Sequence, residues 1–364
     1  MPTSIDISNF LQQSLNTNVV IDVRTPKEFE QGHIPGAVNI PLFSNEERVV
    51  VGTLYKQQGK QPAILKGLEF VGPKMTDIIS KAQACTNAKH STKQKENKND
   101  ELKNNTLYVH CWRGGMRSGS VAWLLELYGI KVFTLKGGYK AFRKYVLESF
   151  SKQYNLLILG GKTGSAKTLV LEKLAALNEQ VINLEKLAAH KGSAFGALGE
   201  NMQPSQEQFE NELATALHLL PSPCGEGLGV RLPPLWLEDE SRLIGNKVIP
   251  EGLWIQMRLA KTLCMNVPFE DRVEYLTEEY GKFPKEELKV SIEKITKRLG
   301  YQQAKNALIA LEENDLKTTC RICLMYYDKS YQHGMDKRDK SSVEQIDFDR
   351  LDIDLIANEL IKHK

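Results

Sequence analysis

Two glycine-rich segments constrain the fold of this chain most, because each follows a short apolar run and precedes a helical pattern. The first is HCWRGGMRS (110–118), which overlaps the end of LYVH (107–110), and the second is GGKTGSAKT (160–168), directly after LLIL (156–159). A loop between a strand and a helix points its backbone N–H groups at an anion. Together with the apolar runs VVIDV (19–23) and KVFTL (131–135), this alternation predicts an α/β fold with a parallel sheet.

The strand–loop–helix pattern restarts near residues 149–155, which predicts two domains. The chain has 364 residues, which is long for one hydrophobic core. We expect one α/β domain over 1–148 and a second over 149–364 that becomes helical beyond about 265. The polar stretch 82–105, rich in lysine and asparagine, predicts a mobile loop inserted in the first domain.

Composition limits the compartment and the partners. No apolar run approaches the roughly 18 residues that span a bilayer, and the start MPTSIDISNF lacks a secretory-signal pattern. We therefore expect a cytoplasmic protein with reduced thiols and no membrane contact. A net charge of +3 does not by itself argue for nucleic acid. Cys320 and Cys323 have no second cysteine pair, so we expect packing there rather than a dedicated metal site.

The first glycine-rich loop carries Cys111 at the point where the strand ends. Arg113 and Arg117 add positive charge, and Gly114 and Gly115 expose backbone N–H groups. This setting lowers the pKa of a thiol and favours the nucleophilic thiolate, so Cys111 is the expected catalytic residue and the other four form an anion cradle. The spacing Cys-x5-Arg also satisfies the signature of cysteine-dependent phosphatases, and the loop alone leaves that alternative open.

The second loop resembles the P-loop pattern G-x-x-x-x-G-K-[ST], with Ala166 where the second glycine is expected. The expected diphosphate-binding residues are Gly161, Gly164, Ser165, Lys167 and Thr168. Lys167 would neutralise phosphate charge, and the Thr168 hydroxyl would hold Mg²⁺ if the site uses it. Alanine restricts φ, so we expect an altered cradle and doubt ordinary ATP hydrolysis.

An apolar run ending in acidic residues lies farther along the second domain. In LWLEDESR (235–242), Glu238 and Asp239 follow the run, where P-loop proteins keep a carboxylate that orients a metal ion or water. A solvent-facing strand end is an equally good interpretation of either carboxylate.

Segments around both loops resemble known families. DVRTPKEFEQGHIPGAVNIPL (22–42) and KGGYKAFR (136–143) resemble the rhodanese-like domain, whose usual sulfurtransferase loop is one residue shorter than the loop at Cys111. Over most of its length the chain resembles the tRNA 2-selenouridine synthase family, in which a rhodanese-like domain precedes a P-loop domain. The further segments that carry this resemblance are VGTLYKQQGK (51–60), CWRGGMRS (111–118), GGKTGSAKT (160–168), LEKLAAHKGSAFG (184–196), WLEDESRLIG (236–245), PFEDRVEYLTEEYG (268–281) and YYDKSY (326–331).

The resemblance implies a tRNA-modifying transferase that replaces sulfur by selenium in wobble 2-thiouridine. It implies two co-substrates: geranyl diphosphate, which S-geranylates the base, and selenophosphate, which then supplies selenium. It assigns selenophosphate to the loop at Cys111 and the prenyl diphosphate to the P-loop. A selenophosphate-supplying enzyme is a possible partner. The remaining alternative is a rhodanese-type sulfurtransferase or a cysteine-based phosphatase fused to an ATPase.

Overall fold

The computed structural model describes residues 2–14, 19–92, 106–219 and 233–364. The chain divides into two compact units, Met1–Ser149 and Phe150–Lys364. Each unit contains its own five-stranded parallel sheet. These sheets confirm the predicted α/β class. No helix in the described part of the chain is long and apolar enough to cross a membrane.

The first unit builds its sheet in the order β1-β5-β4-β2-β3. Its strands are β1 (Thr3–Ile5), β2 (Val19–Asp22), β3 (Val38–Asn39), β4 (Thr106–His110) and β5 (Lys131–Leu135). Its helices are α1 (Ile7–Ser14), α2 (Pro26–Gln31), α3 (Asn45–Gln57), α4 (Lys60–Val71), α5 (Met75–Thr92), α6 (Met116–Leu127) and α7 (Gly138–Ser149), with a 3₁₀ turn at Gly72–Lys74.

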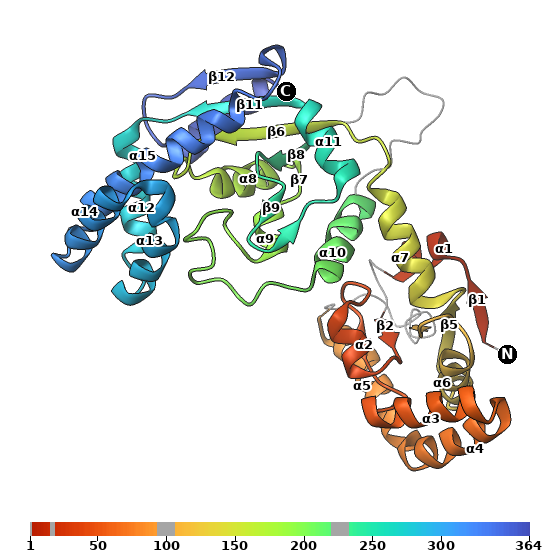
Figure 1. The fold of residues 1–364 in the computed structure, drawn as a ribbon. Coiled ribbons are helices and arrows are strands. Elements are labelled where there is room, and N and C mark those ends of the chain that lie inside the picture. The colour runs from red at the N-terminus through yellow and green to blue at the C-terminus, as the bar shows by residue number, and fades with distance from the viewer. Residues whose placement is uncertain (1, 15–18, 93–105, 220–232) are drawn as a thin grey trace. The chain divides into compact units, whose positions relative to one another are not determined.

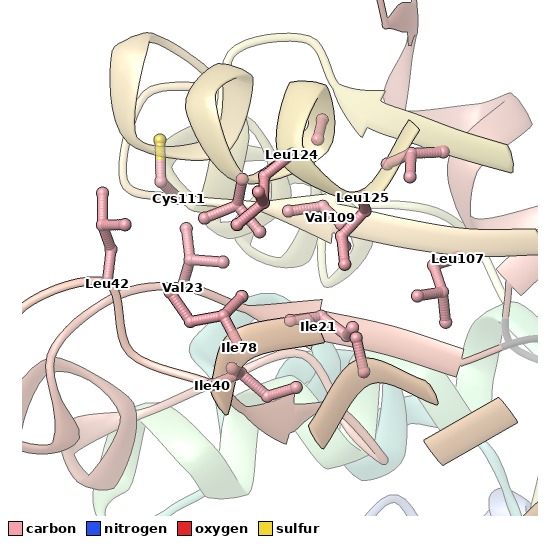
Figure 2. Packing of buried hydrophobic residues seen from close by; sticks show 14 of the residues in the cluster. Ile21, Val23, Ile40, Leu42, Ile78, Leu107, Val109, Cys111, Leu124 and Leu125 are labelled. Atoms are coloured by element: carbon pink, nitrogen blue, oxygen red, sulfur yellow. The ribbon is translucent and has the colours of Figure 1, made fainter. Parts of the chain in front are cut away.

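Apolar side chains of the central strands β2 and β4 form the core of this unit. Ile21 and Val109 are fully buried there, and Leu125 of α6 and Ile78 of α5 pack against the same cluster. Figure 2 shows Cys111 at the edge of this cluster, with its sulfur directed away from the side chain of Val23. The core therefore anchors the strand end that carries the cysteine.

The predicted inserted loop at 82–105 is wrong over its first part, because α5 continues to Thr92. Ile78, Ala82 and Thr86 recur at helical spacing and are buried, and Cys85 is half-buried beside them. Small side chains at this spacing pack against the core even though the segment is polar overall. Residues 93–105 lie outside the described part of the chain.

The second unit builds its sheet in the order β12-β11-β6-β8-β7. Its strands are β6 (Leu156–Gly161), β7 (Gln180–Val181), β8 (Leu235–Glu238), β11 (Lys261–Asn266) and β12 (Val343–Asp347), and a separate hairpin joins β9 (Leu243–Ile244) to β10 (Lys247–Val248). Its helices are α8 (Lys167–Ala176), α9 (Leu184–Ala188), α10 (Gln206–Leu219), α11 (Glu251–Leu259), α12 (Phe269–Tyr280), α13 (Lys285–Leu299), α14 (Tyr301–Glu312), α15 (Leu316–Met335) and α16 (Ile353–Lys362), with a 3₁₀ turn at Lys340–Ser342.

The region beyond 265 is mainly helical, as predicted, and α12 to α15 gather at one end of the second unit (Figure 1). The chain then returns to the sheet, where β12 adds an edge strand beside β11. Sequence reasoning missed this strand because β12 has one buried residue, Ile346. Ile356 and Leu360 of α16 pack in the same core as α8, the helix that follows the P-loop.

Candidate functional site

The loop around Cys111 is held by the segment that follows β5. The backbone N–H of Tyr139 donates to the carbonyl of Cys111 at 2.8 Å, and that of Lys140 donates to the carbonyl of Trp112 at 3.0 Å. Gly114 and Gly138 have φ of +63° and +59°, and a Cβ on Gly138 would lie 2.3 Å from the Cys111 carbonyl oxygen. Both positions therefore need glycine, since a side chain would force the two segments apart.

The Cys111 side chain is 3% exposed. Burial alone would raise the pKa of this thiol. Hydrogen bonds from the Ser118 hydroxyl and from the backbone N–H groups of Ser118, Gly115 and Arg113 lower the pKa by more than burial raises it. The net effect is a pKa below the ordinary value. The sulfur lies 3.2 Å from the Ser118 hydroxyl oxygen. This geometry favours the thiolate.

The two arginines of the loop differ in their surroundings. Arg117 donates to Glu28 at 2.8 Å and is mostly buried with it. Glu28 is placed there because it completes a capping box with Thr25 at the start of α2. Arg113 is exposed. Sequence reasoning missed Glu28 as a partner of the loop, although the capping pattern TPKE (25–28) is legible in the sequence.

Behind the loop, Asp22 and Arg24 form a fully buried ion pair of 2.6 Å. The Arg24 guanidinium lies 3.7 Å from the centre of the Tyr139 ring. His110 is also fully buried, and burial lowers its pKa, so its ring is neutral. The segment Asp22–Arg24 therefore packs against Tyr139, which bonds to the Cys111 carbonyl, and its two charges neutralise each other instead of facing a ligand.

The P-loop connects β6 to α8. The Lys167 ammonium donates to the Gly161 carbonyl at 2.9 Å, and the Ser165 hydroxyl donates to the Lys162 carbonyl at 2.8 Å. Gly164 has φ of +83°. Ala166 takes the left-handed conformation, with φ of +54° and ψ of +35°. The backbone at Ala166 thus adopts a conformation that favours glycine, at a cost in strain.

Glu185 is the carboxylate that lies beside Thr168, and sequence reasoning missed it. The Thr168 hydroxyl donates to Glu185 Oε2 at 2.9 Å. Glu185 sits in the first turn of α9, where the Asn183 side chain caps the helix and Glu238 accepts the N–H of Leu184 at 2.9 Å. The N-cap pattern NLEK (183–186) was the available signal.

The predicted carboxylates Glu238 and Asp239 face different surroundings. Glu238 is fully buried, and burial raises its pKa to about 8. Asp239 forms an ion pair with the buried guanidinium of Arg338. Alternation along the end of β8 separates their side chains. Glu238 thus holds the start of α9 through Leu184, and the charge of Asp239 is neutralised by Arg338.

Glu240 lies two residues beyond the end of β8 and lines the cleft over the P-loop. A Cβ on Gly192 would lie 2.4 Å from Glu240 Oε2, so the carboxyl lies directly against the backbone of Gly192. Burial and the neighbouring Glu185 charge raise the pKa of Glu240 well above its ordinary value. A protonated Glu240 reduces the negative charge that an anionic ligand would meet.

A cleft of about 610 Å³ opens over the P-loop. Its walls include Lys167, Thr168, Glu185, Glu240 and Arg258. In the described residues there is no group of three or more His, Cys, Asp or Glu side chains that could hold a metal ion. In proteins, Mg²⁺ usually keeps several waters and is held by one or two carboxylates together with substrate phosphates.

Together, the two sheets and loops define a class: a rhodanese-like domain joined to a P-loop domain. The rhodanese-like domain model matches residues 8–145. A model described as the AAA domain of tRNA 2-selenouridine synthase matches residues 154–352. The chain belongs to the tRNA 2-selenouridine synthase family.

Curated relatives support this assignment. The tRNA 2-selenouridine synthase of Sulfurovum sp. (strain NBC37-1) is 32% identical, over 91% of this chain and 92% of its own length. The tRNA 2-selenouridine synthase of Proteus mirabilis (strain HI4320) is 36% identical, over 77% of this chain and 70% of its own length. A solved N-terminal domain from Clostridium difficile 630, described as part of an ATP/GTP-binding protein, is 41% identical over 40% of this chain and 99% of that one, with a TM-score of 0.34.

Proposed function

We propose that this protein replaces sulfur by selenium in 2-thiouridine of tRNA, with a geranylated base as the intermediate. The observation that carries the proposal is the match to relatives named tRNA 2-selenouridine synthase, which extends over both units. In the first step the base sulfur attacks the geranyl carbon bonded to oxygen, and inorganic diphosphate leaves. In the second step selenium from selenophosphate bonds to the base carbon, the geranyl thiol leaves, and water takes up the phosphoryl group.

The loop at Cys111 suits the selenophosphate step. Its lowered thiol pKa provides a nucleophile that takes the phosphoryl group from selenium once selenium has bonded to the base; water then hydrolyses the Cys111 thiophosphate to inorganic phosphate and the free thiol. The backbone of Gly114 and Gly115 borders the same turn. Arg113 is the exposed cation that can meet the phosphoryl oxygens. Arg117 is held by Glu28, and in this proposal it orients the loop through that ion pair.

The P-loop suits the prenyl diphosphate step. Lys167 would leave the Gly161 carbonyl to neutralise phosphate charge, while Gly161, Gly164 and Ser165 shape the turn. Where Mg²⁺ takes part, Thr168 and Glu185 are the residues beside it, because Mg²⁺ is usually held by one or two protein oxygens together with substrate phosphates. The ion would stabilise charge on the departing diphosphate. In this proposal, the buried Glu238 supports α9 from behind the site, whereas Asp239 lines the cleft and is paired with Arg338.

The proposed substrate is tRNA carrying 2-thiouridine at the wobble position, and a selenophosphate-supplying enzyme is the proposed partner. The test is nucleoside mass spectrometry of tRNA from cells that lack this protein and are complemented with variants. Wild type restores 2-selenouridine in the proposal. Cys111→Ala abolishes it and leaves geranylated thiouridine, whereas Lys167→Ala abolishes both products.

Cys85→Ala is the matched control, since Cys85 is a half-buried cysteine of the same unit away from the loop. It should restore 2-selenouridine as wild type does. Unchanged 2-selenouridine in the deletion strain would overturn the proposal. Rapid hydrolysis of aryl phosphates by the purified protein would instead favour the cysteine-based phosphatase.

A further inference from the structure

Trp112 is an exposed aromatic side chain next to Cys111 in the chain. It is 38% exposed, although tryptophan is on average a highly buried residue. The centre of its ring lies 5.8 Å from that of Tyr139 and 5.9 Å from Cζ of Arg24. Both of these neighbours are fully buried. The core therefore holds one part of the indole in place, while the rest of the ring faces solvent beside the nucleophile.

The surroundings of Trp112 leave room for a large group. Arg113, Gly115 and Met116 are exposed, and Met116 is 55% exposed. Apart from its neighbours in the chain, no described atom would lie within 4 Å of a Cβ on Gly115. The loop thus presents an aromatic ring, an apolar side chain and a cation on one open surface. Proteins that bind single-stranded nucleic acid combine aromatic rings and positive charge in this way.

Two adjoining segments give this surface a positive charge. HCWRGGMR (110–117) and KGGYKAFRK (136–144) contain arginine and lysine but neither aspartate nor glutamate. The backbone N–H of Lys140 donates to the carbonyl of Trp112 at 3.0 Å, so the second segment lies against the first. Positive charge therefore extends from the loop at Cys111 along α7. The exposed lysines of the second segment are Lys136, Lys140 and Lys144.

We propose that Trp112 stacks an unpaired base of the tRNA beside Cys111, while Lys136, Lys140 and Lys144 contact the neighbouring phosphates. The inference rests on the proposed function for its tRNA substrate and adds the surface that holds the RNA. A base inside a duplex is covered on both faces, so only an unpaired base can stack on a side chain. The lysines favour RNA over a protein partner, because lysine is depleted in protein–protein interfaces.

The test is the affinity of the full chain for a synthetic anticodon stem-loop RNA, measured by fluorescence anisotropy with neither selenophosphate nor geranyl diphosphate present. Trp112→Leu should weaken binding about tenfold, the effect of losing one stacked base. Trp112→Phe keeps an aromatic ring and should retain most of the affinity. Trp123→Leu is the matched control, because Trp123 is 52% exposed farther along α6; it should bind as wild type does.

Lys140→Gln tests the phosphate contacts through their dependence on salt. Loss of one contact to a single strand should reduce the slope of log affinity against log salt concentration by about 0.7. The weakening should be the same for stem-loops of different sequence, since a phosphate contact does not read the bases. Lys60→Gln is the control of equal charge, because Lys60 is an exposed residue of α4 outside both basic segments; it should leave the slope unchanged.

A further measurement uses the wild-type chain and so does not depend on how well a variant folds. The stem-loop should slow acetylation of Lys136, Lys140 and Lys144, followed peptide by peptide, and leave Lys60 unaffected. Wild-type affinity in folded Trp112→Leu, or bound RNA that does not protect these lysines, would overturn the stacking surface alone. Failure of the wild-type chain to bind the stem-loop would instead overturn the tRNA substrate of the proposed function.

Discussion

The Tyr331 hydroxyl of α15 accepts the backbone N–H of Gly161 at 2.8 Å. This bond joins the last strand residue before the P-loop to a helix that begins 155 residues later in the chain, at Leu316. Tyr331 is half-buried at the wall of the cleft, and the desolvation of its hydroxyl raises its pKa well above the ordinary value, so the hydroxyl keeps its proton. Helix α15 therefore holds the backbone of Gly161, where the phosphate-binding turn begins.

Tyr331→Phe should loosen this turn. It leaves the Gly161 N–H without its acceptor, a loss of about 1–3 kcal/mol for a buried group. We expect a lower unfolding midpoint and several-fold weaker binding of inorganic diphosphate. Tyr326→Phe, in the same helix, is the control and should behave as wild type. Equal diphosphate affinity in the two variants would contradict the role given to Tyr331.

Ala166→Gly should stabilise the protein slightly. The left-handed conformation destabilises an alanine by about 1–2 kcal/mol, which glycine would avoid. The greater conformational entropy of glycine in the unfolded chain opposes this stabilisation by about 0.4–1 kcal/mol. Denaturant unfolding measures the difference. Ala175→Gly, at an exposed position in α8, should instead destabilise by about 1 kcal/mol. Losses of similar size in both variants would show that position 166 is unstrained.

Cys111 should react with iodoacetamide at lower pH than an ordinary thiol. Its pKa is lowered, so the thiolate appears earlier as pH rises, whereas burial raises the pKa of Cys85. Ser118→Ala removes a hydrogen bond to the sulfur and should move the alkylation midpoint of Cys111 upward. Ser120→Ala on the same helix should not. Peptide mass spectrometry separates the two cysteines, and coincident midpoints would count against an activated Cys111.

Glu238 should make stability fall as pH rises. Burial raises its pKa from 4.5 to about 8 in the folded state, so the folded protein retains a proton that the unfolded chain loses first. Stability is therefore greatest below pH 4.5 as far as this group is concerned, and declines up to about pH 8. Glu238→Gln should flatten the profile in that window, measured by urea unfolding. Glu251→Gln, at an exposed carboxylate, should leave the slope as in wild type; an unaltered slope in Glu238→Gln would refute the prediction.

The sequence predicted the fold class and the two loops well because both signals are local. Apolar runs and glycines mark where Cys111 and Lys167 follow a strand. The partners of those loops were harder to predict, since they come from distant segments. Glu28 reaches Arg117 across 89 positions, and Arg338 reaches Asp239 across 99.

The carboxylate beside Thr168 shows the same limit. Glu185 and Glu238 each follow a leucine, Asp239 and Glu240 come directly after Glu238, and nothing local distinguishes the one that accepts the Thr168 hydroxyl. Glu185 is placed beside Thr168 because the start of α9 is bonded to Glu238 at the end of β8. The strand β12 was missed for a related reason, because its pairing with β11 is formed by backbone groups that carry no sequence signature.

The contact of Gly138 with the turn at Cys111 has a consequence for synthesis of the chain. Every strand of the first sheet except β5 is complete once His110 has been made, but the turn gains its backbone donors only when Tyr139 and Lys140 follow. A nascent chain that ends between these points holds the cysteine without the two hydrogen bonds that brace its loop. The lowered thiol pKa at Cys111 should therefore appear only after Tyr139 and Lys140 have been added to the chain and have bonded to the loop.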